Sequence, residues 1–240
     1  MNIAIILAGG TGSRFGGEEP KQFALVGDKT VLEHSVEAFA CVDAVDEICI
    51  VSHPNWIGRV RDMFEKRGLA TKVIAGGEER FMSSLNAIMA YIDYPDDTNL
   101  IFHDAARPCV SGEVINSVIK ALHVYEAVGV GVPATDTLWE VAVTSDSMER
   151  SPAEPYALLR VPERRRYWMA QTPQAFRLPV VRDAYQRGLQ YPMFRPTDDC
   201  GVVSRYMPEK KIHLVRGDAN NIKITTQHDL DTARSVLVSP

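Results

Sequence analysis

The sequence predicts an α/β protein built on a mostly parallel sheet. Short, nearly continuous apolar segments alternate with longer segments of helical periodicity. Strands that are apolar on both sides are typical of a sheet covered by helices on both faces. Glycine-rich or polar segments follow several of these strands, as expected where a parallel sheet binds ligands. The pattern therefore favours a Rossmann-like sheet with helices on both faces.

In the first 133 residues, strands and helices alternate regularly. Uninterrupted apolar runs predict strands, and apolar residues at every third or fourth position predict helices. In chain order, we expect a strand at 3–8, helix 29–40, strand 47–52, helix 57–67, strand 71–75, helix 82–92, strand 99–103, helix 114–125 and strand 128–133.

Residues 135–166 interrupt this alternation. They contain short β-prone pieces separated by polar, proline-containing turns. We interpret them as a hairpin-like β-arm that projects from a single domain spanning residues 1–240. Such an arm cannot bury its own apolar residues, so we expect it to join two copies in a homodimer.

After the arm the alternation resumes. Residues 167–176 (YWMAQTPQAF) lead into a predicted helix at 179–188. We then expect a helix ending at 206, a strand at 212–216 and a last helix at 228–236. A strand-like turn at 220–226 (NNIKITT) delivers another cation, Lys223.

The composition argues against several partners and compartments. A net charge of −5 and a pI of about 5.7 provide no general basic field for nucleic acid or an anionic membrane. The first apolar run is too short for a signal peptide or a spanning helix. Four cysteines without C-x-x-C spacing favour reduced thiols, and so a cytoplasmic protein.

The loop after the first strand is the clearest candidate for phosphate binding. Within residues 3–23 (IAIILAGGTGSRFGGEEPKQF) it contains five glycines and two cations, Arg14 and Lys21. Glycines let backbone N–H groups converge on anionic oxygens. Phe15 stands where the dinucleotide fingerprint needs a third glycine, and no Gly-Lys-Ser/Thr follows, so neither familiar phosphate loop is present. A glycine-rich turn without a ligand is the alternative.

Two further motifs follow predicted strands. Residues 76–80 (GGEER) come after one strand, and residues 103–108 (HDAARP) close another. One site at the carboxyl edge of the sheet explains all three loops. Asp104 is placed to reach a substrate hydroxyl or Mg²⁺, although it could also serve only as a turn or cap residue. We interpret His103 as a hydrogen-bonded structural residue rather than a base.

The candidate residues favour group transfer by charge neutralisation. The chain offers no nucleophile elbow, while its cations include Arg107 and Arg164 besides those named above. Cations and Mg²⁺ can hold a triphosphate while an acceptor oxygen attacks in line, and an ionised phosphate acceptor needs no general base. The arginines at 164–166 leave two alternatives. They are a solvated charge run, or one of them recognises an acceptor phosphate, in its own site or in that of a neighbouring subunit.

Taken together, these motifs resemble one enzyme family over nearly the whole chain. LAGGTGSRFG…PKQF, GGEERFMSS, HDAARP, DTL, QTPQAF, TDD and NNIKITT occur in the order found in cytidylyltransferases acting on sugar-alcohol phosphates. That family includes the 2-C-methyl-D-erythritol 4-phosphate and ribitol-5-phosphate cytidylyltransferases. The resemblance implies a nucleotidyltransferase-type fold, a dimer with an exchanged arm, and a Mg²⁺-assisted attack of the acceptor phosphate on the α-phosphorus of CTP.

The resemblance also implies roles for individual residues. Arg14, Lys21 and Lys223 would be catalytic, neutralising the triphosphate. The nucleotide would be held by Ala8, Gly9, Gly10, Gly12, Gly77, Glu78 and Ser83. The acceptor or ribose would be held by Asp104, Arg107, Thr137, Arg164 and Thr197. The metal would be bound by Asp104 or by the CTP phosphates alone.

The acceptor is the remaining choice. The 161–167 segment before QTPQ and the sequence Asp136-Thr137-Leu138-Trp139 lean toward ribitol 5-phosphate, whereas HDAARP leans toward 2-C-methyl-D-erythritol 4-phosphate. Two other classes stay open: a sugar-1-phosphate nucleotidyltransferase using UTP or GTP, and a nucleotide-sensing protein without enzymatic activity.

Overall fold

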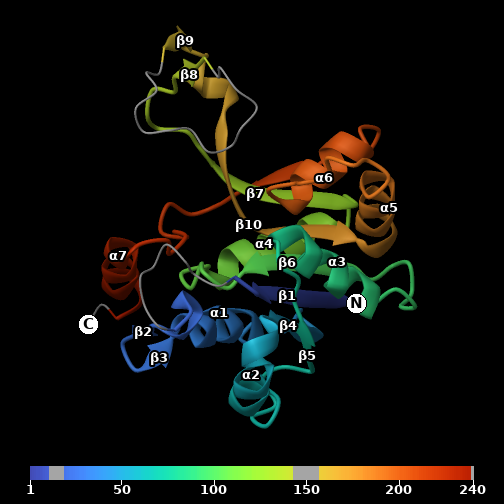
Figure 1. Ribbon diagram of the computed structural model, residues 1–240, viewed down its shortest axis with the longest axis vertical. Helices are drawn as coiled ribbons and strands as arrows, with labels where there is room; N and C mark the ends of the chain where they lie inside the picture. The colour runs from blue at the N-terminus through green and yellow to red at the C-terminus, as the bar shows by residue number, and fades with distance from the viewer. Residues whose placement is uncertain (11–18, 143–156, 239–240) are drawn as a thin grey trace.

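A seven-stranded sheet forms the centre of the protein (Figure 1). The computed structural model describes residues 1–10, 19–142 and 157–238. Across the sheet the order is β11-β7-β10-β6-β1-β4-β5, and every pairing is parallel except those of β10. The strands are β1 (Asn2–Ala8), β4 (Glu47–Ser52), β5 (Lys72–Ala75), β6 (Asn99–Asp104), β7 (Ala127–Pro133), β10 (Trp168–Arg177) and β11 (His213–Arg216). The prediction of a mostly parallel sheet is therefore confirmed.

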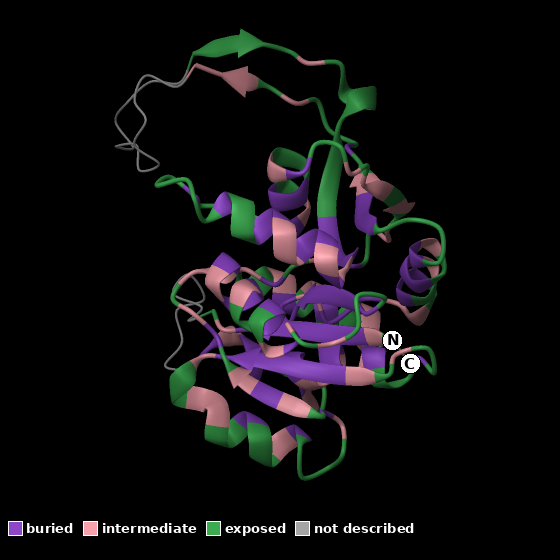
Figure 2. Cartoon of the chain, turned by 90° about the vertical axis from the view of Figure 1, so that its right-hand side faces the viewer, coloured by how far each residue is buried: buried purple, intermediate pink, exposed green. Residues whose placement is uncertain are grey.

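Helices cover both faces of this sheet, because side chains alternate along each strand. In β1, Ala4 and Ile6 face one layer, formed by α1 (Val31–Ala40), α2 (Ile57–Phe64) and α4 (Gly112–Leu122). Ile3 and Ile5 face the other layer, formed by α3 (Arg80–Ala90), α5 (Leu178–Gly188) and α6 (Asp199–Tyr206). The buried residues of the two layers meet at the sheet (Figure 2). A further helix is α7 (Gln227–Leu237).

Local signals in the sequence account for most helix starts. Thr30 caps α1 in a reciprocal box with Glu33, and Thr226 caps α7 in the same way with Asp229. The helix expected at 57–67 ends earlier, at Phe64. Gly68 adopts a φ of +69° there, and the amide of the next residue donates to the carbonyl of Phe64, which closes the helix.

β10 is the only strand of the large sheet that runs antiparallel to its neighbours. It runs from the arm into the large sheet, where it lies between β7 and β6. Its pairing with β7 shifts register between Gln171 and Ala175. This strand therefore carries the QTPQ segment from the arm into the edge where β6 ends.

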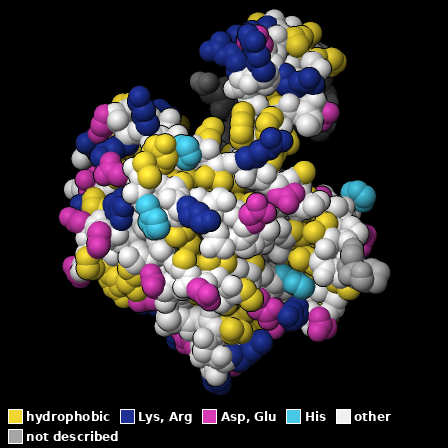
Figure 3. All heavy atoms as spheres, turned by 180° about the vertical axis from the view of Figure 1, so that it is seen from behind, with side chains coloured by type: hydrophobic (Ala, Val, Ile, Leu, Met, Phe, Trp, Pro, Cys, Tyr) yellow, Lys and Arg dark blue, Asp and Glu magenta, His cyan; other side chains and the backbone are white. Residues whose placement is uncertain are grey.

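The predicted arm projects from the body (Figure 1). Its two short strands, β8 (Glu140–Val141) and β9 (Leu158–Arg160), pair antiparallel, while residues 143–156 lie outside the described residues. Trp139 is 69% exposed and Leu159 is 62% exposed. Hydrophobic side chains lie on the arm and where it leaves the body (Figure 3). The arm thus presents apolar residues that its own chain does not cover.

Smaller elements complete the described chain. They are the two-stranded sheet of β2 (Leu25–Val26) and β3 (Lys29–Thr30), and the 3-10 helices η1 (Lys21–Phe23), η2 (Pro54–Trp56) and η3 (Arg164–Arg166). Because Lys29 and Thr30 belong to a strand, the helix expected from residue 29 begins at Val31. Among the described residues, no helix has the length and apolar character needed to cross a membrane.

Candidate active site

A cavity of about 290 Å³ opens at the carboxyl edge of β1 and β6. The three strand-end loops predicted to form one site meet there with the segment that carries Lys223. The expected site residues among its lining are Ala8, Gly9, Gly10, Lys21, Gly77, Glu78, Ser83, Asp104 and Lys223. Gly12 and Arg14 lie outside the described residues.

Two glycines let the backbone of this cavity pack closely around Ser83. A Cβ at Gly9 would lie 2.9 Å from Ser83 Oγ, and one at Gly76 would lie 2.7 Å from it. Ser83 is buried, and its Oγ accepts a hydrogen bond from the amide of Gly77 over 3.2 Å. A side chain at either glycine would displace the Ser83 hydroxyl. Backbone at Gly9 and Gly77 lines the cavity beside Ser83.

Gln22 and Lys21 join the first loop to its surroundings. The buried Gln22 donates through Nε2 to the carbonyls of Ala8 (3.0 Å) and Gly10 (3.3 Å), which fixes the entry to the glycine loop. Lys21 Nζ donates to the carbonyl of Ile224 over 2.7 Å, although the two residues are 203 positions apart. Lys21 and the Lys223 segment consequently lie together at the cavity.

Asp104, the last residue of β6, lies between two cations. Its Oδ1 accepts from Arg80 Nε over 3.0 Å and its Oδ2 accepts from Lys223 Nζ over 2.7 Å. Burial by itself would raise the pKa of Asp104, but Arg80, Lys223 and Arg107 outweigh it and hold that pKa well below its usual range. The carboxylate is therefore ionised throughout the physiological pH range.

These contacts bear on whether Asp104 can hold a metal. Both of its oxygens already accept hydrogen bonds from cationic groups. Within the described part of the chain, no three His, Cys, Asp or Glu side chains come together as a metal site. Mg²⁺ is commonly bound through one or two carboxylates together with substrate phosphates. An Asp104–metal contact would require Lys223 or Arg80 to move.

Arg107 anchors the Lys223 segment. Its Nη1 donates to the carbonyl of Asn221 over 2.7 Å and its Nη2 to that of Ala170 over 3.3 Å. The fully buried Asn221 in turn donates to the carbonyl of Thr172 over 2.8 Å. Arg107 thus lines the second hollow rather than the first cavity, and its two terminal nitrogens engage the backbone.

His103 has the structural role that the sequence favoured. Thr172 Oγ1 accepts from the amide of Asp104 and lies 3.1 Å from His103 Nδ1, so its hydroxyl donates to that nitrogen. This assigns the proton to Nε2, which donates to the carbonyl of Arg107 over 3.1 Å. Burial lowers the pKa of His103 to about 4, so the ring is neutral and does not face the cavity chemistry.

Arg80 is a site residue that was quoted within a motif but given no role. It is the first residue of α3, lines the cavity and reaches both Asp104 and the buried Asp199. The arginine in GGEER was the available signal. Its carboxylate partners, 24 and 119 positions away, are not visible from local spacing.

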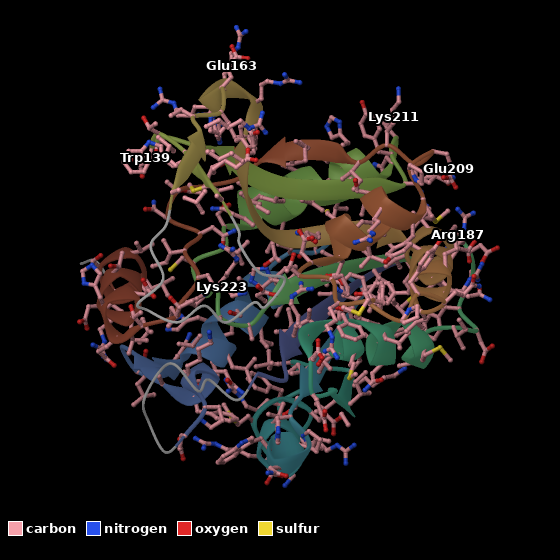
Figure 4. All side chains as sticks on the ribbon, turned by 45° about the horizontal axis from the view of Figure 1, so that its top comes forward. Trp139, Glu163, Arg187, Glu209, Lys211 and Lys223 are labelled. Atoms are coloured by element: carbon pink, nitrogen blue, oxygen red, sulfur yellow. The ribbon has the colours of Figure 1, made fainter. Side chains whose placement is uncertain are left out.

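A second hollow of about 580 Å³ adjoins the first through Lys223. Its polar lining includes Arg107, Thr135, Gln171, Arg216 and Asn221. Three expected acceptor residues line neither hollow: Thr197 is exposed just before α6, and Thr137 and Arg164 belong to the arm. Arg164 Nη1 donates to the carbonyl of Thr135. Figure 4 shows Lys223 in the body and Trp139 and Glu163 on the arm.

Comparisons with known proteins show similarity to cytidylyltransferases over nearly the whole chain. The family model described as "IspD: 2-C-methyl-D-erythritol 4-phosphate cytidylyltransferase" matches residues 2–239. A 2-C-methyl-D-erythritol 4-phosphate cytidylyltransferase of Thermobifida fusca is 41% identical over 98% of this chain and 92% of its own length. A ribitol-5-phosphate cytidylyltransferase of Lactiplantibacillus plantarum is 33% identical over 99% of this chain and 98% of its own.

Two further matches extend the comparison. The bifunctional ribulose 5-phosphate reductase/CDP-ribitol pyrophosphorylase of Haemophilus influenzae is 40% identical over 99% of this chain, which spans 48% of that longer protein. The crystal structure of 4-diphosphocytidyl-2C-methyl-D-erythritol synthase from Anaerococcus prevotii superposes with a TM-score of 0.81 at 28% identity, covering 99% of this chain and 98% of the other.

Proposed function

The chain belongs to the IspD family of cytidylyltransferases, and from this we propose that it transfers CMP from CTP to a polyol phosphate and releases pyrophosphate. The observation that carries the proposal is the convergence of Lys21, Lys223 and Asp104 on one backbone-walled cavity. That arrangement suits a ligand with a flat base at one end and several negative charges at the other.

We propose one orientation for CTP in the cavity. Backbone at Ala8, Gly9 and Gly77, together with Ser83, would offer donors and acceptors to the cytosine base. Lys21 and the glycine loop would hold the phosphates at the other end, with Arg14 as a second cation. Glu78 is exposed at the rim and would contact the edge of the base.

The reaction is a direct displacement at the α-phosphorus. An oxygen of the acceptor phosphate forms a bond to the α-phosphorus while the bond to the oxygen that bridges the α- and β-phosphorus breaks, and pyrophosphate leaves with the electron pair. Because the acceptor oxygen is already ionised, no proton needs to be removed. Lys223 would move from Asp104 to an oxygen of the α-phosphate and stabilise the charge of the transition state.

Mg²⁺ is proposed to enter with the triphosphate rather than on a protein site. It would neutralise phosphate charge when bound, and its ligands would be phosphate oxygens and water. Asp104 keeps its contact with Arg80 in this account when Lys223 moves to the α-phosphate.

The comparisons do not favour ribitol 5-phosphate over 2-C-methyl-D-erythritol 4-phosphate. A relative named for one acceptor is 41% identical to this chain and a relative named for the product of the other is 40% identical, so these two identities do not separate the acceptors. We therefore propose a polyol phosphate as the substrate class, with these two compounds as the acceptors to be compared.

We further propose that the arm completes the acceptor site of a second copy of the chain. Thr137 and Arg164 lie on the projecting arm, outside the lining of their own cavity, and exposed apolar residues surround them. Arginine suits bidentate recognition of a phosphate. We place this homodimer in the cytoplasm, where its four free cysteines would stay reduced.

Pyrophosphate release tests the proposed function. The protein is incubated with CTP, UTP, GTP or ATP in the presence of Mg²⁺ and of ribitol 5-phosphate, 2-C-methyl-D-erythritol 4-phosphate or a sugar 1-phosphate. We expect release only with CTP and a polyol phosphate, and kcat/KM ranks the two acceptors. Release with UTP or GTP and the sugar 1-phosphate would instead indicate a sugar nucleotidyltransferase. CTP binding without turnover would indicate a nucleotide-sensing protein.

A further inference from the structure

Arg80 connects two carboxylates from different parts of the fold. Its Nε lies 3.0 Å from Asp104 Oδ1 at the end of β6, and its Nη1 lies 2.9 Å from Asp199 Oδ2 at the start of α6. The rigid guanidinium fork fixes the distance and direction between these carboxylates, which a lysine ammonium cannot do. The start of α6 is thereby tied to the edge of the nucleotide cavity.

Asp199 is satisfied on both oxygens and fully buried. Its other oxygen, Oδ1, accepts a 2.6 Å hydrogen bond from the hydroxyl of Tyr185 in α5. Burial by itself would lower the pKa of Arg80, but Asp199 and Asp104 outweigh it and raise that pKa, so the guanidinium carries a full charge. The three charged groups form a buried chain that runs from α6 to the cavity.

A buried ion pair is not needed for stability as such. Removing two charges from water costs much of what their attraction returns, and apolar pairs of equal volume are often as stable. What such a pair does provide is a fixed relative position of the elements that carry it. Here Arg80 fixes the position of Asp199 relative to Asp104.

The segment just before α6 includes Thr197, which we assign to the acceptor. Asp198 caps α6 through the amide of Gly201, and it also accepts from Gln174 Nε2 over 2.8 Å. Gln174 belongs to β10. Arg80 links this segment directly to the carboxylate that holds Lys223.

We propose that Arg80 and Asp199 are positioning residues that hold the acceptor side of the site, around Thr197, in register with Asp104 and Lys223. This inference rests on the proposed function and deepens it. Acceptor affinity and the transfer step then depend on the Arg80–Asp199 pair. CTP binding does not depend on Asp199, which lies outside the nucleotide cavity.

The test compares Asp199→Asn and Arg80→Lys with Tyr185→Phe as a matched control. Tyr185→Phe removes a buried hydrogen bond from the same carboxylate but leaves both contacts of Arg80 in place. Steady-state assays give kcat and the KM for the acceptor, calorimetric titration gives the Kd for CTP without acceptor, and thermal unfolding confirms that each variant is folded.

For Asp199→Asn we expect the acceptor KM to rise about tenfold and kcat to fall by a similar factor, the change produced when one positioning contact is lost. The Kd for CTP should stay within about twofold of wild type, as should every constant of Tyr185→Phe. In Arg80→Lys, adding Asp199→Asn should have little further effect on the acceptor KM, because the two residues act as one unit.

Several results would overturn this inference. One is an unchanged acceptor KM in Asp199→Asn. Others are a loss of CTP affinity in that variant as large as its loss of acceptor affinity, or an effect of Tyr185→Phe as large as that of Asp199→Asn. Failure of both Asp199→Asn and Arg80→Lys to fold would make the pair a stability element. Failure of the proposed function is a separate result, because the wild-type protein would then turn over neither polyol phosphate.

Discussion

Lys223 Nζ donates to Asp104 Oδ2 over 2.7 Å, an ion pair between residues 119 positions apart in the chain. It places the C-terminal cation over the end of β6, beside the loop that carries Lys21. Asp104 is shared with Arg80, so its negative charge is more than neutralised. An incoming α-phosphate can therefore draw Lys223 away without leaving the carboxylate unpaired.

Lys21→Ala should lower kcat by about 10²–10³, the loss typical when one preorganised charge-stabilising donor is removed. The variant also loses the contact between Lys21 Nζ and the carbonyl of Ile224. Pyrophosphate release at saturating CTP measures the effect. Lys29→Ala is the control, because Lys29 pairs with Glu37 outside the cavity and should keep wild-type kcat. A near-wild-type kcat for Lys21→Ala would remove the role assigned to this residue.

Mixed dimers test whether the arm serves the neighbouring site. Arg164→Ala and Lys21→Ala should each be poorly active alone. If Arg164 acts in the partner's site, one site in every mixed dimer is intact. Random mixing should then restore about a quarter of wild-type activity, since half of the dimers are mixed and one of their two sites works.

Co-expression of the two variants with different tags allows this measurement. Arg165→Ala is the control for Arg164→Ala, because Arg165 pairs with Glu163 on the surface and should be dispensable. No recovery on mixing, or a monomer by sedimentation, would mean that the arm does not act across an interface.

Asp229→Asn should make the stability of the protein less dependent on acid pH. Partial burial would raise the pKa of Asp229, but hydrogen bonds from Thr225 and Thr226 outweigh it and lower that pKa to about 2. The unfolded chain titrates nearer 3.8. A depressed carboxyl pKa stabilises the fold above the unfolded value, and this contribution is lost as the pH falls from about 3.8 to 2.

Because Asp229 is only partly buried, its contribution to the free energy of unfolding should be that of a helix cap, about 0.5–1 kcal/mol, rather than the full pKa shift. Denaturant unfolding of the wild-type protein and of Asp229→Asn, at pH 7 and at successively lower pH, measures the difference between their free energies of unfolding. This difference should become smaller below pH 4. Asp231→Asn on the same helix is the control, as Asp231 makes only a surface pair with Arg234. A difference that stays constant down to pH 2 would contradict the assignment.

Much of the fold could be predicted because local signals were strong. The bounds of the strand at 47–52 could be predicted, since its central residues 48–51 are apolar and a His-Pro turn follows it. The antiparallel direction of β10 could not be predicted, because it follows from how the arm returns to the body and not from the apolar pattern of 168–177. The early end of α2 follows from local hydrogen bonds around Gly68, whose positive φ does not appear in the apolar pattern of residues 57–67.

The candidate site, like the fold, could be predicted only in part from the sequence. Loops at strand ends identified Lys21, Gly77 and Asp104, since parallel strands bring their carboxyl ends to one edge. The buried partners of these residues could not be predicted from spacing. Arg80 meets Asp199 only because α3 and α6 cover the same face of the sheet.

The most direct test of the account is a single turnover of CTP labelled at the α-phosphorus, with enzyme in excess and a polyol phosphate present. We predict that the label appears in a CDP-polyol. Lys223→Gln should slow this step by about 10²–10³ while CTP still binds with similar affinity. A wild-type single-turnover rate in Lys223→Gln, or label appearing only in free CMP, would contradict the claim that Lys223 and Asp104 form the transfer site.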